Sequence, residues 1–257
     1  MKARPAVGRL RGKTRAGRLA LWDALMVGLF PEPVSRGVAE VGAGERADTL
    51  LDLAALLGGT GASLAVLEVH PRRAAMAREA LAGHRVAVWE TDALEPVAVP
   101  GQGVVRCANV LRQYPVAMVS SGHEGLGSRV HIGGVVLEGS CDAGGDVGSF
   151  HVLRKTEAGL ERESLVFFTS FARGFAPIQM RDWLPRDLRH QVRAGGALER
   201  FFGAWTAGWA AERTGLPPVD FRSACDALGA QWVDLSDVRS DAAAMVWRPA
   251  DGVPAPT

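Results

Sequence analysis

Glycines and an acidic residue follow the first short apolar segment of this sequence, in the order Glu40-Val-Gly-Ala-Gly44. The two glycines allow a sharp backbone turn and let a ligand approach the main chain without a Cβ in the way. The same spacing, completed by Ala47, also fits the dinucleotide-binding pattern Gly-x-Gly-x-x-Ala. The glycines therefore predict a nucleotide-type ligand without saying which one.

Glu40 distinguishes between two such ligands. A dinucleotide would bring its pyrophosphate close to this position, where an ionised carboxylate repels it. The same carboxylate attracts the cationic end of a sulfonium amino acid. Glu40 therefore favours S-adenosylmethionine as the cofactor. The rival, a dinucleotide-dependent oxidoreductase, predicts that NAD and not S-adenosylmethionine raises the melting temperature.

Three more polar residues, Glu68, Asp92 and Asn109, lie at or just after the ends of later apolar segments. A carboxylate at 68 suits the two ribose hydroxyls of any nucleoside, and an acceptor at 92 suits the adenine amino group. Each acid alone could equally cap the next helix or turn. In open α/β sheets, however, ligands bind outside the carboxyl ends of the strands, where all of these residues would lie.

Apolar segments alternate with helical patterns over the first half of the chain. Strands are predicted at 38–41, 63–69, 85–89, 103–110 and 133–138, and helices at 48–57 and 72–81. This alternation indicates a parallel sheet covered on both faces. Two further strands, at 151–155 and 165–171, suit a closing hairpin. We expect a Rossmann-like, mostly parallel seven-stranded sheet flanked by helices, with an antiparallel edge strand and extra C-terminal helices.

The two ends of the chain have different compositions. Residues 2–18 hold seven basic residues and no acid, which predicts either a solvated arm or a contact with a phosphate or carboxylate, and a helix is expected over 16–29. Further helices are predicted at 181–192 and 198–213. One face of the last helix is apolar, which predicts core packing or, alternatively, a tryptophan-lined pocket. Its residues are Leu198, Phe201, Phe202, Trp205 and Trp209.

We therefore expect three regions: a basic arm and helix over 1–37, a cofactor-binding domain over 38–175, and a helical region over 176–257 packed on the same domain. The composition, with 47% hydrophobic and 22% charged residues, is typical of a globular protein. A net charge of +1 indicates no overall commitment to nucleic acid or membrane. Three cysteines and six histidines are scattered, so no metal site is expected. No apolar run approaches a membrane span, and a cytoplasmic location is expected.

Four motifs in order resemble those of class I S-adenosylmethionine-dependent methyltransferases. They are Glu40-Val-Gly-Ala-Gly44, Leu67-Glu68-Val69, Thr91-Asp92-Ala93 and Arg106-Cys-Ala-Asn109-Val-Leu111. Four stretches resemble a little-characterised bacterial branch of that superfamily: Arg11-Gly-Lys-Thr-Arg15, Asp48-Thr-Leu-Leu, Arg106-Cys-Ala-Asn-Val-Leu-Arg-Gln-Tyr114 and Gly133-Gly-Val-Val-Leu-Glu-Gly-Ser-Cys-Asp142. The superfamily resemblance covers about Val38 to Asp142.

The resemblance implies a role for each matching residue. Glu40, Gly42 and Gly44 would hold the methionine part of the cofactor, Glu68 the ribose and Asp92 the adenine. Asn109 would face the methyl group. The chain departs from the family pattern at Arg46, which replaces a frequent third glycine.

No residue of the sequence is assigned as catalytic. Neither an Asn-Pro-Pro-Tyr signature nor a Pro-Cys nucleophile is present, and Cys107 is predicted to be a buried core residue. His123, Glu124 and, more remotely, Tyr114 are candidate bases. His123 falls in a glycine- and serine-rich segment that is predicted to be a flexible loop, where a solvated histidine is the competing interpretation.

The sequence thus predicts a methyltransferase that acts on an unidentified acceptor, expected to be a small molecule. Two alternatives stay open. One is an inactive methyltransferase-like module that binds the cofactor and regulates another protein. The other is an RNA methylase that uses the basic arm, whose binding should weaken steeply with salt. Neither the acceptor nor the oligomeric state can be read from the residues.

Overall fold

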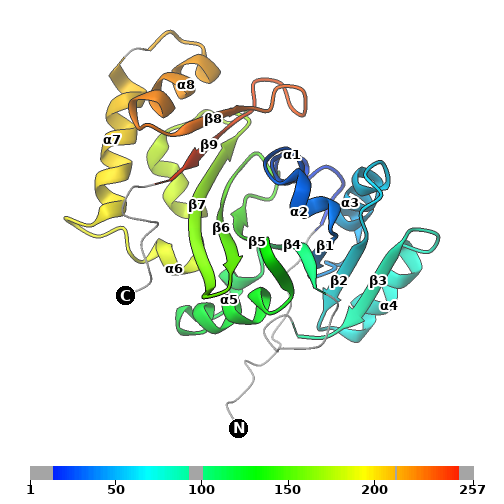
Figure 1. Cartoon of the computed structure of the whole chain (residues 1–257). Coiled ribbons are helices and arrows are strands. Elements are labelled where there is room, and N and C mark those ends of the chain that lie inside the picture. Colours follow the sequence, from blue (N-terminus) through cyan, green and yellow to red (C-terminus); the bar gives the residue numbers. More distant parts are fainter. Residues whose placement is uncertain (1–13, 93–100, 212, 249–257) are drawn as a thin grey trace.

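The computed structural model describes residues 14–92, 101–211 and 213–248. Their strands form one nine-stranded sheet in the order β3-β2-β1-β4-β5-β6-β7-β9-β8. Figure 1 shows this sheet curving through the molecule with helices on both faces. Most of the predicted basic arm, up to Lys13, lies outside the described residues.

One half of the sheet is parallel, as the alternating pattern predicts. Its strands are β1 (Val38–Val41), β2 (Leu64–Glu68), β3 (Val86–Glu90), β4 (Gln102–Ala108) and β5 (Val130–Cys141). Helices α3 (Asp48–Gly58) and α4 (Pro71–Ala80) connect the first three strands. The side chains of β1 and β2 are buried on both faces, which explains why these strands are largely apolar and do not alternate with exposed polar residues.

The other half of the sheet is antiparallel. It consists of β6 (Val147–Thr156), β7 (Gly159–Thr169), β9 (Ala243–Trp247) and β8 (Gln231–Asp234). Four strand pairings are parallel and four are antiparallel. The expectation of seven mostly parallel strands with one antiparallel edge strand is therefore corrected to nine strands, half of them paired antiparallel. The sequence pattern missed β8 and β9 because each is short and neither alternates clearly between apolar and polar residues.

Helices α1 (Ala20–Leu29) and α2 (Pro31–Ser35), together with α3 and α4, lie on one face of the sheet. Trp22 of α1 is fully buried and stacks on Phe150 of β6, with 4.6 Å between the ring centroids. Helix α1 begins four residues later than predicted, after a turn in which Gly17 has a φ of 71°. The same apolar cluster therefore joins α1 to both halves of the sheet.

The opposite face carries α5 (Val119–Gly127), η3 (Pro177–Trp183), α6 (Arg186–Arg189), α7 (Ala197–Ala211) and α8 (Pro217–Ala227). The apolar face predicted for α7 is buried, which confirms its core role. The helix predicted over 181–192 is wrong. Pro185 has no N–H to donate, and Leu184 before it is extended, so η3 ends there and only the short α6 follows.

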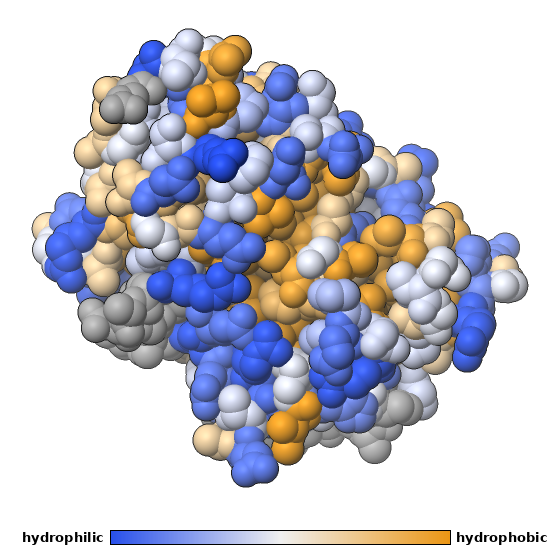
Figure 2. Space-filling view, turned by 45° about the horizontal axis from the view of Figure 1, so that its top comes forward, coloured by the Kyte–Doolittle hydropathy of each residue, from blue (hydrophilic) through white to orange (hydrophobic). Residues whose placement is uncertain are grey.

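The surface of the molecule is hollowed on the face seen in Figure 2, where hydrophobic side chains gather in the hollow and hydrophilic ones edge it. In the described part of the chain, none of the helices combines the length and apolar character that a membrane span needs.

Candidate functional site

The residues predicted to bind a ligand meet at one edge of the sheet. Strands β3, β2, β1 and β4 are neighbours and run in the same direction, so their carboxyl ends lie side by side. The glycine loop follows β1, Glu68 ends β2, and Asp92 and Asn109 come just after β3 and β4. The structure therefore brings these six residues together, as strand order requires.

Glu68 fastens the glycine loop to the end of β2. One oxygen of its buried carboxylate accepts the N–H of Ala43 at 2.7 Å, and the other accepts the N–H of His70 at 2.8 Å. The N–H of Gly42 donates to the carbonyl of Leu67 at 2.8 Å. A carboxylate has about four lone-pair sites, so Glu68 keeps acceptor capacity for further hydroxyl donors.

The glycine loop requires its glycines. Gly42 and Gly44 have φ values of 89° and 71°, in the left-handed region that a side chain disfavours. A Cβ on Gly44 would come within 2.3 Å of Thr14 Cγ2. The N-terminal segment therefore packs directly against the loop, a contact that the sequence did not predict.

Glu40 lies in a buried ion cluster. Its carboxylate pairs with Arg106, its cross-strand neighbour on β4, and Arg106 also pairs with Asp23 of α1. Burial raises the pKa of the Glu40 carboxyl and lowers the pKa of Arg106 to about 9, so the guanidinium remains charged at neutral pH. Sequence reasoning missed Arg106 and Asp23, although an arginine inside an apolar strand signals a buried partner.

Tyr114 lies near the acids at the ends of β2 and β3. Burial raises the pKa of its phenol to about 12, and the negative charges of Asp92 and Glu68 act in the same direction. The phenol therefore keeps its proton at neutral pH and acts as a hydrogen-bond donor. Tyr114 is unsuited to the role of general base that the sequence left open for it.

Asn109 joins the carboxyl ends of β4 and β5. It is one of the few non-glycine residues with positive φ, at 63°. Its side-chain oxygen accepts the N–H of Cys141 at 3.1 Å, and its amide nitrogen lies 3.2 Å from the Cys141 sulfur. The Nη1 of Arg112 donates to the same oxygen at 3.3 Å. Such strain at a position fixed by several bonds is typical of functional sites.

His123 does not lie in a flexible loop. It belongs to α5, its side chain is 8% exposed, and its Nε2 lies 3.3 Å from a carboxylate oxygen of Glu138 on β5. The loop prediction was wrong because three glycines in a nine-residue helix lower helix propensity, and packing against β5 overrides that preference.

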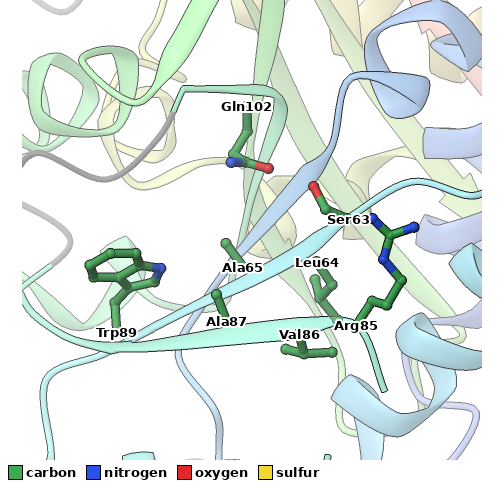
Figure 3. A pocket seen from close by; sticks show the side chains of 8 residues that line it. All are labelled: Ser63, Leu64, Ala65, Arg85, Val86, Ala87, Trp89 and Gln102. Carbon is green, nitrogen blue, oxygen red and sulfur yellow. The ribbon is translucent and has the colours of Figure 1, made fainter. Parts of the chain in front are cut away.

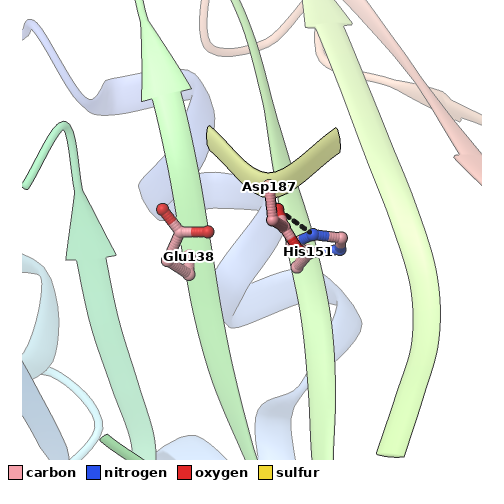
Figure 4. Close-up of side chains that lie close together, drawn as sticks. All are labelled: Glu138, His151 and Asp187. Carbon is pink, nitrogen blue, oxygen red and sulfur yellow. Dashed lines mark hydrogen bonds and ion pairs between the residues drawn. The ribbon is translucent and has the colours of Figure 1, made fainter. Parts of the chain in front are cut away.

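A buried polar cluster continues from His123 across the sheet. Glu138 and His151 are cross-strand neighbours on β5 and β6, and Asp187 of α6 lies over them (Figure 4). His151 Nε2 is 3.0 Å from Asp187, and Arg162 of β7 donates to Asp187 at 2.5 Å. The cluster separates two apolar clusters on this face of the sheet.

Glu138, His151 and Asp187 have the geometry to hold a metal ion, since one ligand atom from each lies within 4.8 Å of the others. The Arg162 guanidinium already faces two of them, because Nη1 also lies 2.9 Å from His151 Nε2. A cation would therefore compete with a resident positive charge. The sequence gives no signal for this cluster because its members are dispersed over about fifty residues.

A shallow depression of about 400 Å³ lies on the β2–β3 face (Figure 3). Its lining comes mostly from the amino ends of β2, β3 and β4, and includes Ser63, Arg85 and Gln102. It therefore lies away from the edge that carries the glycine loop.

The chain matches no protein-family model and no curated protein. Among solved structures it is similar to N-methyltransferase NodS from Bradyrhizobium japonicum WM9, crystallised with S-adenosyl-L-homocysteine, at 19% identity and a TM-score of 0.38. That alignment covers 48% of this chain and 59% of NodS. It is also similar to CalS10, an amino pentose methyltransferase from Micromonospora echinaspora with bound S-adenosylmethionine, at 19% identity and a TM-score of 0.41. The coverage there is 62% of this chain and 69% of CalS10.

A dehydrogenase is similar to the same degree. The putative Zn-dependent alcohol dehydrogenase from Rhodobacter sphaeroides has 20% identity and a TM-score of 0.37, with 50% of this chain and 56% of that chain covered. At these identities and TM-scores, structural likeness does not discriminate between methyl and hydride transfer. The residues of the site have to do so.

The raised pKa of Tyr114 can be measured directly because it is the one tyrosine of the chain. Absorbance at 295 nm should show a phenol that titrates near 12 in the folded protein. In urea, the midpoint should return to about 10, the value of an unperturbed tyrosine. A midpoint near the unperturbed value in the folded protein would contradict the placement of Tyr114 beside Glu68 and Asp92.

Asp187→Asn should destabilise the protein by about 3 kcal/mol at neutral pH, because it leaves Arg162 and His151 without their buried carboxylate. Burial alone would raise the pKa of Asp187, but His151 and Arg162 outweigh it and hold this pKa well below the usual range. The stabilisation is therefore complete above the pKa of an unfolded aspartate, about 4, and is lost as pH falls below it.

Urea unfolding from pH 7 to pH 2.5 measures the free energy of unfolding of the wild type and of Asp187→Asn. The difference in this free energy between the two proteins should narrow as the solution becomes acidic. Asp182→Asn is the matched control, since Asp182 is 78% exposed and pairs with Arg189 at 3.3 Å on the surface. A gap that is independent of pH, or an equal loss in the control, would contradict the role given to Asp187.

Proposed function

We propose that the chain is an S-adenosylmethionine-dependent methyltransferase. The observation that carries the proposal is the carboxyl edge of β3, β2, β1 and β4, where Glu68 is bonded to the glycine loop and Asp92 follows the next strand. This arrangement offers a close backbone approach, a carboxylate for ribose hydroxyls and an acceptor for an adenine amino group at one place.

Electrostatics favour a sulfonium nucleoside over a dinucleotide at this edge. A dinucleotide places its pyrophosphate at the glycine loop and the N-terminus of the following helix. Here α3 begins with Asp48, which pairs with Arg46 at 3.4 Å, and Glu45 of the loop pairs with Arg73 at 3.6 Å. Arg106 beneath the loop is shared between Glu40 and Asp23, so this cluster carries no net positive charge even with Glu40 protonated. The loop therefore offers a pyrophosphate no excess positive charge, whereas its carboxylates suit a cation.

Each candidate residue lies where it could contact one part of S-adenosylmethionine. Gly42 and Gly44 would approach its methionine part, with Glu40 just before the loop at the end of β1. Glu68 would accept ribose hydroxyls and Asp92 the adenine amino group. The cofactor supplies a methyl group that its sulfonium already activates. The chain has to align the acceptor with this methyl group, and we assign that task to Asn109 at the end of the neighbouring strand β4.

The acceptor is proposed to be a small molecule. A second candidate, a cofactor-binding module without turnover, stays open, since Tyr114 keeps its proton and no candidate base is assigned to an acceptor. Transfer of label from methyl-labelled S-adenosylmethionine to a lysate fraction decides between them. Label in small molecules supports the enzyme, label in RNA supports the RNA methylase, and saturable binding without transfer supports the module.

Calorimetric titration tests the cofactor assignment. S-Adenosylmethionine should bind the wild type in a saturable manner, and Glu68→Gln should weaken binding about tenfold or more, because it removes a charged acceptor and places an N–H₂ donor near the Ala43 N–H. Glu79→Gln changes an exposed glutamate of α4 and should bind like the wild type. NAD should not bind.

Thermal melts of both variants show whether the fold is kept. The assignment fails if a folded Glu68→Gln protein binds as well as the wild type, or if NAD binds and S-adenosylmethionine does not.

A further inference from the structure

Four arginines surround the carboxyl ends of β4 and β5. Burial lowers the pKa of the Arg112 guanidinium, and the positive charges of Arg189, Arg18 and Arg186 lower it further. The Cys141 thiol cannot offset them, because burial raises its pKa and keeps it neutral. Arg112 therefore lies in a locally cationic environment next to Asn109.

Arg112 is held in place from two sides. Its Nη1 donates to the Asn109 side chain at 3.3 Å, and its guanidinium carbon lies 5.4 Å from the centre of the Trp183 ring. The Trp183 carbonyl accepts a hydrogen bond from the Ser149 hydroxyl of β6 at 2.9 Å. The tryptophan is thus fixed to the sheet, and the guanidinium that stacks on it is preorganised.

The nearby polar groups engage two of these arginines and leave the other two without a carboxylate. Arg189 pairs with Asp182 at 3.3 Å, and Arg18 donates to the Asp142 carbonyl at 3.2 Å. Within the described ranges, neither Arg112 nor Arg186 forms an ion pair with a carboxylate, and the buried Nε of Arg186 has no hydrogen-bond partner. Two guanidiniums beside the end of β4 therefore retain unused donors.

The buried polar cluster around Asp187 determines where Arg186 lies. It precedes Asp187 on the four-residue α6, and the contacts of Asp187 with His151 and Arg162 fix that helix on the sheet. A helix this short is not stable alone, so these contacts are what hold Arg186 on the same side of the sheet as Arg112.

We propose that Arg112 and Arg186 bind an anionic group, a carboxylate or a phosphate, of the methyl acceptor beside Asn109. Planar guanidiniums suit both groups because each offers paired oxygens to the fork of N–H donors. The proposal rests on the proposed function, since it takes Asn109 as the residue next to the transferred methyl group. It adds the chemical class of the acceptor.

Fluorine NMR of the protein loaded with S-adenosylhomocysteine tests the anion site. The probes are 4-fluorobenzoate for a carboxylate, 4-fluorophenyl phosphate for a phosphate, and neutral 4-fluorobenzamide as the matched control. At least one anion should broaden and shift on titration, while the amide should not. Arg112→Gln and Arg186→Gln should each weaken that binding about tenfold or more, the loss expected for a charge-assisted hydrogen bond.

Arg222→Gln is the control variant. Arg222 also lies over a tryptophan, 5.0 Å from the centre of the Trp232 ring, but on the antiparallel half of the molecule. It should bind the anion like the wild type. Arg112→Lys keeps the positive charge but loses the paired N–H donors, and it should bind the anion with intermediate affinity. It provides a second variant of Arg112 in case the glutamine variant does not fold.

The outcomes separate this proposal from the proposed function. If neither anion binds, if the amide binds equally, or if Arg222→Gln loses as much affinity as Arg112→Gln, the anion site is wrong. Calorimetry with S-adenosylmethionine on the same variants should give wild-type affinity. Intact cofactor binding without anion binding overturns the acceptor class alone, whereas no cofactor binding in the wild type overturns the proposed function.

Discussion

The buried ion cluster of Arg106 with Glu40 and Asp23 ties the molecule together. A fully buried guanidinium is tolerated only when carboxylates compensate it. These carboxylates come from β1 and α1, so the cluster fixes α1 across the parallel strands. The segment before α1 is fixed as a consequence, and Thr14 packs against Gly44 of the glycine loop. The conformation of the loop therefore depends on a contact buried in the core beneath it.

We assign different roles to the two halves of the sheet: cofactor binding to the parallel half and acceptor positioning to the antiparallel half. The parallel half brings the glycine loop, Glu68 and Asp92 to one edge, and this is where we place the cofactor. The antiparallel half carries His151 and Arg162, which hold α6 and its arginines beside the end of β4. Asn109 lies at the junction, since its side chain bonds to the end of β5. The acceptor would thus be positioned by one half and the methyl donor by the other.

Local pattern was sufficient to predict the first four strands of the parallel half, whereas β5 is three residues longer at each end than predicted. Strand β1 has the predicted bounds, and β2, β3 and β4 differ from prediction by one or two residues at their ends. Because parallel neighbours end at one edge, the sequence pattern alone groups the six candidate ligand-binding residues. Their contacts could not be predicted: Glu40 pairs with Arg106 of β4, and Arg106 takes its second carboxylate from Asp23 of α1, far away in the sequence.

The antiparallel half was harder to predict because long-range contacts decide it. Strands β8 and β9 are four and five residues long and pair only after the chain has passed through α7 and α8. His123 lies in a segment whose local composition favours a loop, and packing makes it helical. The cluster of Glu138, His151 and Asp187 assembles from a strand pair and a helix that sequence spacing does not relate.

A crystal structure of the full chain grown with S-adenosylhomocysteine tests the central claim most directly, with NAD in a parallel crystallisation. We expect density for S-adenosylhomocysteine at the glycine loop, with ribose oxygens within hydrogen-bond distance of Glu68 and the adenine amino group at Asp92. The NAD crystals should show no ligand there. Density for NAD across the glycine loop and the start of α3, or S-adenosylhomocysteine bound away from Glu68, would contradict the account.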